Sequence, residues 1–282
     1  MKAARFDLVR PRDLSEALAA LGATAGLVKV LAGGQSLGPM LNLRLVEPDL
    51  LVDIAGIPEL RRIDREADAL VFGACVTHAD FEDGRAPDVG RDMLARVASG
   101  IAYRAVRNRG TIGGSLAHAD PAADWVSTLS ALGAEVEIAS RSGRRRLTIG
   151  AFITGALATA LQPGELLVAV RIPLVSAAAR FGYVKHARKI GEFAHAIGAA
   201  LVDPERGTAR AVAGAIDAPP LVIEDALALF DRSSGLDREE AGRRLAAGGV
   251  EDAVDRHIHL EALGRALAQA FDATPPALRS AA

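Results

Sequence analysis

The stretch Ala32-Gly33-Gly34-Gln35-Ser36-Leu37 follows directly on a short apolar run at residues 27–31. Paired glycines allow positive φ angles, and because they lack a Cβ they let backbone N–H groups approach a bound molecule closely. A concave row of such N–H groups binds anions, phosphate above all. The Gln35 amide and the Ser36 hydroxyl add further donors. Taken alone, this stretch is weak evidence for a binding site, and an ordinary tight turn is the favoured interpretation.

A second stretch, Thr111-Ile112-Gly113-Gly114-Ser115, again pairs two glycines with hydroxyl side chains. Two facing loops of this kind suit a diphosphate, because they can share its negative charge between them. Neither stretch is a Walker motif, since no lysine follows the glycines at the required spacing. Neither matches the G-x-G-x-x-G turn that opens a Rossmann helix. The pair therefore disfavours kinase, ATPase and conventional nicotinamide-dehydrogenase functions.

Outward from the two stretches, strands and helices follow one another at short spacing. Strands are expected over residues 27–31 (a short buried strand), 50–54, 69–72, 135–138, 144–148 and 166–172. Helices are expected after Pro11 with an Asp13/Glu16 cap, after Thr77 with an Asp80 cap, and from Pro121 to near Gly133. This arrangement indicates an α/β or α+β domain rather than a helical bundle.

The pattern changes after an alanine-rich link at residues 176–180. Three strands (181–187, 194–202 and 209–216) are expected to precede three helices (223–230, 238–247 and 254–271). Strands in a run followed by helices in a run predict an α+β module with its helices on one face of the sheet. We place the boundary between the two modules near residue 177. The tail after Pro275-Pro276 is expected to be loose.

Composition excludes several classes of protein. The 282 residues are 50% hydrophobic and carry a formal net charge of -2, so neither a disordered chain nor a polycation that binds nucleic acid is expected. No run is long enough to span a membrane, and Arg5, Asp7 and Arg10 interrupt any signal peptide. The single cysteine, Cys75, excludes an internal disulfide, a thiolate zinc site and a self-contained iron–sulfur cluster. We expect a soluble cytoplasmic protein.

Several charged residues invite two interpretations each. Asp120 and Asp124 have the spacing of a carboxylate pair for general acid–base catalysis, but we favour Asp120 as the cap of a helix opened by Pro121, with Asp124 binding a hydroxyl. His118 is expected to be a positioned loop residue, and His257 and His259 to be surface residues rather than metal ligands. The arginines Arg104, Arg107 and Arg109 suit a solvated face and a diphosphate or partner contact equally well.

Residues 32–45, the second glycine stretch and the segment His118-Ala119-Asp120-Pro121-Ala122-Ala123-Asp124 together closely resemble the FAD-binding medium subunits of molybdenum hydroxylases. The likeness covers the whole chain. It implies an α+β fold in two domains. A two-part FAD-binding domain of the PCMH type would occupy residues 1–177, with subdomains of about 1–56 and 57–177. A smaller domain of the CO dehydrogenase flavoprotein C-terminal type, a three-stranded sheet with helices, would occupy 178–282.

The resemblance also implies which residues hold FAD. In the family both glycine stretches hold the diphosphate, the residue matching Asp124 hydrogen-bonds cofactor hydroxyls, and the one matching Ile101 packs on the cofactor. Phe193 stands where relatives often carry a tyrosine beside the flavin ring, and Ser115 replaces the more usual asparagine. The full implied set is Ala32, Gly33, Gly34, Gln35, Ser36, Leu37, Ile101, Thr111, Gly113, Gly114, Ser115, Asp124, Leu167, Lys185 and Phe193.

The function that the resemblance implies is electron transfer. Substrate would be oxidised at a molybdopterin cytosine dinucleotide-type molybdenum cofactor on a large subunit. Electrons would pass through [2Fe-2S] clusters on a small subunit to FAD in this chain, and then to NAD, oxygen, a quinone or a cytochrome. A dimer of heterotrimers is expected, with no metal ligand and no catalytic acid or base in this chain. The alternative is a stand-alone FAD-dependent oxidoreductase with its own substrate pocket, which the short second module disfavours. A scaffold protein that has lost its flavin is disfavoured by the intact loops.

Overall fold

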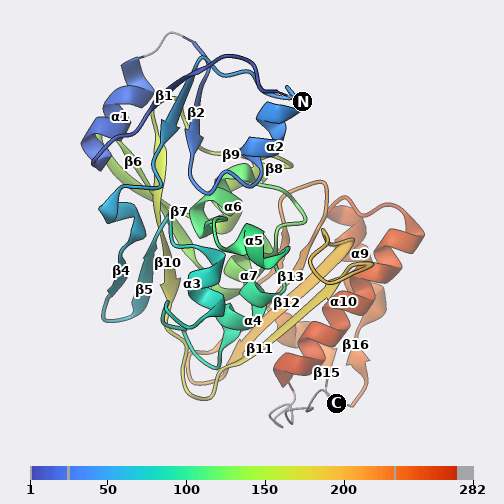
Figure 1. The fold of residues 1–282 in the computed structure, drawn as a ribbon. Helices are drawn as coiled ribbons and strands as arrows, with labels where there is room; N and C mark the ends of the chain where they lie inside the picture. Colours follow the sequence, from blue (N-terminus) through green and yellow to red (C-terminus); the bar gives the residue numbers. More distant parts are fainter. Residues whose placement is uncertain (1, 24–25, 232, 272–282) are drawn as a thin grey trace.

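The computed structural model of the chain describes residues 2–23, 26–231 and 233–271. The described residues form three larger sheets and two small sheets of two strands each. Figure 1 shows the larger sheets following one another from the N-terminal to the C-terminal part. The predicted loose tail after Pro276 lies outside the described residues. No helix in the described part of the chain combines the length and apolar character that crossing a bilayer requires.

The first sheet is parallel, with the strand order β1-β3-β2. Its strands are β1 (Asp7–Val9), β2 (Val28–Leu31) and β3 (Leu50–Asp53), connected by helices α1 (Leu14–Ala23) and α2 (Leu37–Asn42). The Asp13 carboxylate accepts the Glu16 N–H at 2.8 Å, so the capping prediction for α1 is confirmed. The prediction of a buried strand before the first glycine stretch is wrong, because β2 lies at the edge of the sheet and is only half-buried.

The second sheet is antiparallel, with the strand order β4-β5-β10-β6-β7. Its strands are β4 (Ile63–Arg65), β5 (Ala69–Gly73), β6 (Glu135–Ser140), β7 (Gly143–Thr148) and β10 (Leu166–Pro173). Helices α3 (His78–Glu82), α4 (Met93–Ser99), α6 (Ile112–His118) and α7 (Asp124–Leu132) share one apolar core with a face of this sheet. Shorter elements complete the unit: η1 (Pro58–Arg61), α5 (Arg104–Arg107), α8 (Ile149–Phe152), β8 (Ile153–Gly155) and β9 (Ala158–Thr159).

The third sheet is also antiparallel, in the order β11-β12-β13-β14. Its strands are β11 (Arg180–His186), β12 (Ala196–Asp203), β13 (Thr208–Gly214) and β14 (Leu221–Ile223), followed by η2 (Ala226–Ala228), β15 (Phe230–Asp231), β16 (Gly235–Leu236), α9 (Arg238–Ala247) and α10 (Ala253–Phe271). Helix α10 packs on the strands β11 and β12, and α7 of the preceding unit packs on β12 and β13 (Figure 1). The sheet thus joins the two parts of the molecule.

Several sequence predictions about elements are wrong. The C-terminal sheet has a fourth strand, β14, where three strands were expected, because Val222 pairs with Val212 of β13. In place of the helix expected over 223–230, the chain forms the end of β14, the short helix η2 and the start of β15. The helix expected from Pro121 begins only at Asp124. The second glycine stretch is the first turn of helix α6 rather than a separate turn. The α+β class is confirmed, and the domain boundaries at residues 56 and 177 stay predictions.

Candidate functional site

The first glycine stretch presents unpaired donors. Gly34 takes a φ of 72°, as the sequence predicts for a glycine in such a loop. The carbonyl oxygens of Gly33, Gly34 and Ser36 accept bonds from the Gln35 side chain, the Gly38 N–H and the Met40 N–H. Among the described residues, the backbone N–H groups of residues 33–36 donate no hydrogen bond to the protein. With these three carbonyl oxygens paired and the N–H groups of residues 33–36 free, the loop suits an anionic group.

The second glycine stretch has its donors paired already. The N–H groups of Ile112 and Gly113 donate to carbonyl oxygens of residues 76 and 74, each at 3.0 Å. The Gly114 N–H donates at 3.0 Å to the Thr111 hydroxyl, which caps helix α6. The expectation of two facing rows of free N–H groups is therefore wrong for this stretch. What it can offer a ligand is the half-buried Ser115 hydroxyl.

The structure brings the two stretches together. A Cβ built on Gly33 would lie 2.1 Å from the Arg109 carbonyl oxygen and 2.8 Å from Gly110 Cα. A Cβ on Gly114 would lie 3.8 Å from the Ala32 Cβ. The Arg109 guanidinium also donates to the Gly33 carbonyl oxygen at 3.3 Å. The backbones meet this closely only because Gly33 has no side chain, so this glycine serves the contact between the loops rather than a positive φ.

Two further predicted residues meet at a buried ion pair. Asp124, the first residue of α7, is 6% exposed, and its Oδ2 lies 3.0 Å from Lys185 Nζ on β11. Its Oδ1 accepts a 2.6 Å hydrogen bond from the Tyr183 hydroxyl. Burial raises the pKa of the Asp124 carboxyl, against the opposing effects of Lys185 and Tyr183. Each carboxylate oxygen has capacity for a further donor, so a cofactor hydroxyl fits here.

Tyr183 is a site residue that sequence reasoning missed. A signal for it existed, because Tyr183 and Lys185 alternate along one strand and side chains two apart point to the same face of a sheet. Burial, followed by the negative charge of Asp124, raises the pKa of the Tyr183 phenol well above its ordinary value. The phenol therefore stays protonated and donates to the carboxylate.

Asp120 does not join this cluster. Its Oδ1 accepts the Ala122 N–H at 2.9 Å, which closes a local turn. The prediction that it caps the helix is wrong, because α7 begins four residues further on, at Asp124. Neither carboxylate contacts the other within the described residues, so the arrangement does not form the acid–base pair that the spacing allowed.

The other implied cofactor residues are dispersed. Ile101 is half-buried beside the core, and Phe193 is 70% exposed in the connection between β11 and β12. Leu167 on β10 is only 3% exposed and packs inside the core, so its side chain is not on the surface that the loops share. Ala32, Gln35 and Leu37 are half-buried and Ser36 is exposed. The roles of these residues stay predictions.

Two histidines depart from expectation. His259 was expected at the surface, but it is 4% exposed and bonds the Asp255 carbonyl oxygen at 2.8 Å, because it lies on the face of α10 that is turned to the sheet. His78, which the sequence did not single out, is 5% exposed and supports the second stretch. Its backbone N–H donates to the Gly110 carbonyl oxygen at 2.9 Å, and its side-chain Nδ1 accepts a hydrogen bond from the Trp125 indole N–H at 3.0 Å.

Comparisons with known proteins match most of the chain. The family model of the FAD binding domain in molybdopterin dehydrogenase matches residues 4–175. The caffeine dehydrogenase subunit beta of Pseudomonas sp. (strain CBB1) is 38% identical over 206 residues, which is 73% of this chain and 70% of that protein. The carbon monoxide dehydrogenase medium chain of Hydrogenophaga pseudoflava is 37% identical over 203 residues, 72% and 70% of the two chains.

Solved structures extend the match to the C-terminal part. Carbon monoxide dehydrogenase from Hydrogenophaga pseudoflava, in a form lacking the Mo-pyranopterin moiety of its molybdenum cofactor, gives a TM-score of 0.85 at 32% identity and covers 96% of this chain and 99% of that chain. Quinoline 2-oxidoreductase from Pseudomonas putida 86 gives a TM-score of 0.80 at 30% identity, and the match covers 96% of this chain and 98% of that chain. The fold is therefore shared by both modules and not by residues 4–175 alone.

Proposed function

Because the chain belongs to the family of FAD binding domains in molybdopterin dehydrogenases, we propose that it carries electrons between an iron–sulfur partner and an external acceptor. The chain is the FAD-binding medium subunit of a molybdenum hydroxylase, and thus part of an oxidoreductase. Its partners in the proposal are a large subunit with a molybdopterin cytosine dinucleotide-type molybdenum cofactor and a small subunit with [2Fe-2S] clusters. Two such heterotrimers form a dimer in the cytoplasm.

The observation that carries the proposal is the pairing pattern of the first loop. Among the described residues its N–H groups at residues 33–36 donate to no protein group, whereas the carbonyl oxygens of Gly33, Gly34 and Ser36 are hydrogen-bonded. A diphosphate presents only acceptors, so this loop holds it through backbone donors, and the Ser115 hydroxyl of the adjoining stretch adds another. Bound FAD supplies the redox chemistry. The chain supplies binding and electrostatics: Asp124 accepts a cofactor hydroxyl, and Lys185 keeps that carboxylate charged.

The single cysteine supports the need for a partner. Cys75 is the only cysteine in the 282 residues, and each [2Fe-2S] cluster requires several cysteine ligands. Cys75 is also buried, its Sγ lies 3.7 Å from the Ile54 carbonyl oxygen, and burial raises the pKa of its thiol to about 12. Every thiolate that holds a cluster must therefore come from another chain.

The stand-alone alternative requires a substrate pocket beside the flavin. A cavity of about 210 Å³ lies on the second sheet, but carboxylate and guanidinium side chains line most of it, among them Glu59, Arg62, Glu137 and Arg144. None of its lining residues belongs to either glycine stretch. This cavity is therefore not a substrate pocket beside the glycine stretches.

The proposed function is tested by purifying the native complex through a tag on this chain. We expect bound FAD together with iron and molybdenum, and a native mass that fits two heterotrimers. Preparations of this chain that stay colourless after incubation with FAD would refute the flavin assignment. Flavin reduced directly by an organic substrate, in a chain that never associates with an iron–sulfur partner, would instead favour the stand-alone enzyme.

A further inference from the structure

Helix α5 (Arg104–Arg107) lies between two segments that the proposed FAD site uses. Ile101 precedes it, and Arg109–Gly110, which meet Gly33, follow it. None of the side chains of α5 is buried. A helix this short is unstable by itself, and protein helices owe most of their stability to packing of an apolar face. Polar contacts must therefore hold α5 in place.

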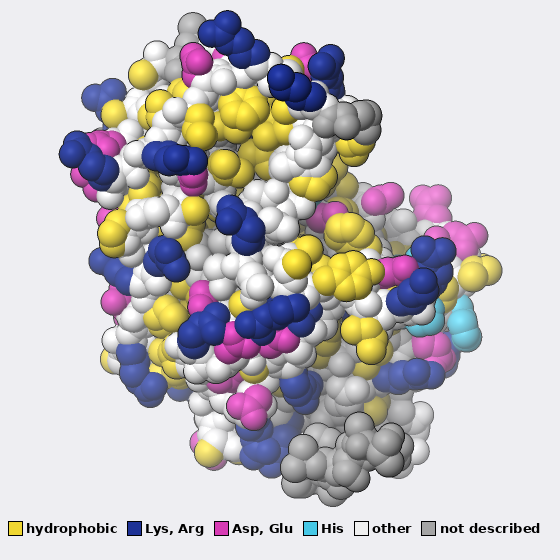
Figure 2. Space-filling model, in the orientation of Figure 1, with side chains coloured by type: hydrophobic (Ala, Val, Ile, Leu, Met, Phe, Trp, Pro, Cys, Tyr) yellow, Lys and Arg dark blue, Asp and Glu magenta, His cyan; other side chains and the backbone are white. Residues whose placement is uncertain are grey.

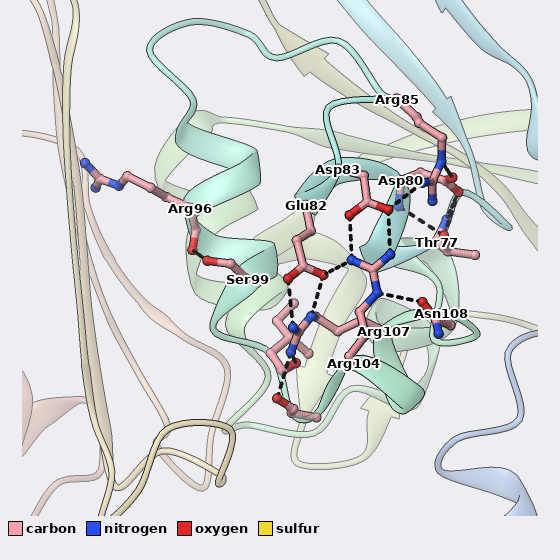
Figure 3. A network of polar contacts seen from close by, with 12 residues as sticks. Thr77, Asp80, Glu82, Asp83, Arg85, Arg96, Ser99, Arg104, Arg107 and Asn108 are labelled. Atoms are coloured by element: carbon pink, nitrogen blue, oxygen red, sulfur yellow. Dashed lines mark hydrogen bonds and ion pairs between the residues drawn. The ribbon is translucent and has the colours of Figure 1, made fainter. Parts of the chain in front are cut away.

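Those contacts come from the C-terminal end of α3. Glu82 and Asp83 bind the guanidinium groups of Arg104 and Arg107 (Figure 3). Figure 2 shows dark blue and magenta side chains lying against each other on this face of the molecule. Helix α3 is itself well anchored, since Phe81 is 1% exposed in the core and Thr77 forms a capping box with Asp80. The acidic pair thus offers α5 a fixed support.

Arg107 differs from Arg104 because it bonds backbone carbonyl oxygens as well as an acidic side chain. Its Nε and one terminal nitrogen donate to the two carboxylate oxygens of Glu82 at 2.7 and 2.8 Å. Its other terminal nitrogen donates to the carbonyl oxygens of Ile101 and Ala102 at 3.0 and 2.9 Å. The Arg107 side chain is 12% exposed, against 48% for Arg104, which bonds no backbone carbonyl among the described residues. Only a planar guanidinium reaches both sets of acceptors at once.

The two carbonyl bonds fix an unfavourable backbone corner. Ala102 has a φ of 44°, in the left-handed region that a residue with a Cβ seldom adopts. Gly191, in the connection that carries Phe193, lies so close that a Cβ on it would be 2.7 Å from the Ala102 carbonyl oxygen. The corner at Ala102 therefore also packs against the connection between β11 and β12 of the C-terminal module. Without Arg107, the carbonyl oxygens of the half-buried residues Ile101 and Ala102 lose this donor, and the two bonds no longer offset the strain at Ala102.

We propose that Arg107, held by Glu82, is a positioning residue for the FAD site: it sets the corner at Ile101–Ala102 and, through α5, the contact of Arg109–Gly110 with Gly33. This inference rests on the proposed function, because it takes the loops and Ile101 as the cofactor's neighbours. It replaces both sequence interpretations of Arg107, since the side chain neither faces solvent nor is free to neutralise a diphosphate.

The test compares two identical changes on one helix. Arg107→Lys keeps the charge but loses the planar fork, and Arg104→Lys does the same for the arginine that touches no carbonyl. The protein, purified with its accompanying subunits, is stripped of flavin and titrated with FAD. We expect Arg107→Lys to raise the dissociation constant about tenfold or more, and to alter the absorption and visible circular dichroism of the bound flavin. Arg104→Lys should stay within about twofold of wild type, with an unchanged spectrum.

The outcomes distinguish a failure of the proposed function from a failure of the inference about Arg107. If wild type binds no FAD, the proposed function fails. If wild type binds FAD and the two variants weaken it equally, or if Arg107→Lys lowers thermal stability without changing flavin affinity and spectrum, Arg107 has a structural role only and the inference is overturned. Should Arg107→Lys not fold, Glu82→Gln serves instead, because it weakens the hold on Arg107. It should weaken FAD binding and alter the flavin spectrum, and unchanged values would contradict the inference.

Discussion

The Tyr183 hydroxyl on β11 donates a 2.6 Å hydrogen bond to the Asp124 carboxylate at the start of α7. This bond joins the two modules, because Asp124 lies within the part matched by the FAD-binding family model, residues 4–175, and Tyr183 lies beyond it. Lys185, two residues along the same strand, binds the other carboxylate oxygen at 3.0 Å. The carboxylate expected to bind a cofactor hydroxyl is thus oriented by the C-terminal module.

Replacing Tyr183 by phenylalanine should weaken FAD binding. The change removes a donor to a buried carboxylate, which costs about 1 to 3 kcal/mol of unfolding free energy and weakens the hold on Asp124. We expect a loss of several-fold in FAD affinity, measured by flavin titration. Tyr103, the chain's other tyrosine, is 68% exposed and supplies the matched control. Equal affinities for Tyr183→Phe and Tyr103→Phe would show that Asp124 does not depend on the phenol.

Adding a single methyl group at Gly33 should separate the two loops. The Cβ of Gly33→Ala would lie 2.1 Å from the Arg109 carbonyl oxygen, far inside contact distance. We expect FAD retention to be lost, as measured by the flavin content of the purified protein. Gly38→Ala is the control, because a Cβ there meets nothing within 4 Å. Full flavin occupancy in Gly33→Ala would exclude the loop contact as part of the site.

Gly114→Val should also lose flavin, for a different reason from the positive φ suggested by sequence. A Cβ at Gly114 would lie 2.8 Å from the Thr111 hydroxyl, so a valine displaces the cap of α6 and with it Ser115. The flavin content of the purified variant measures this effect. Retention of flavin at the wild-type level would mean that the cap does not shape the site.

Stability should depend on pH through His78. Burial, with a smaller effect from Arg107, lowers its pKa from 6.5 to about 4. Between about pH 4 and pH 6.5, His78 is therefore protonated in the unfolded chain but neutral in the folded chain. Stability is full above about pH 6.5 and falls as the pH decreases towards about 4, by at most about 3 kcal/mol. In His78→Gln, urea unfolding followed by Trp125 fluorescence should lose this part of the pH dependence, and an unchanged profile would contradict the assignment.

The C-terminal sheet should not tolerate a side chain at Gly182. A Cβ there would lie 1.8 Å from the Ala266 carbonyl oxygen of α10, so Gly182→Ala must push the helix off the sheet. We expect a loss of several kcal/mol in the free energy of unfolding. Gly242→Ala within α9 has room for a Cβ, and should stabilise by up to about 1 kcal/mol. Thermal unfolding of both variants tests the contrast, and similar midpoints would exclude the close packing.

The features that could be predicted from the sequence were those determined by residues close together in the chain. The caps at Asp13 and Thr77 depend on neighbouring residues, and both are as predicted. Strand β14 was missed because its pairing with β13, not its own residues, decides its conformation. The pairing of donors in the two glycine stretches likewise depends on distant carbonyls, at residues 74 and 76 for the second one. Sequence alone could therefore place both stretches but not tell which of them has free donors.

The hydrogen bonds of Arg107 and the bond from Tyr183 to Asp124 could not be predicted from the sequence for the same reason. Each joins segments that are adjacent only in the folded chain. The alternation of Tyr183 and Lys185 along one strand indicated that the two share a face of the sheet, but no local pattern identified Asp124 as their partner. The family resemblance supplied Asp124 and Lys185, and the fold then showed that they contact each other.

The most direct test of the FAD site is amide hydrogen exchange with and without FAD. If the first loop holds the diphosphate through its free donors, exchange at residues 33–36 should slow markedly when FAD binds. Exchange at residues 112–115 should change little, because those N–H groups are already hydrogen-bonded within the protein. Flavin binding that leaves the exchange of residues 33–36 unchanged would contradict the assignment of this loop.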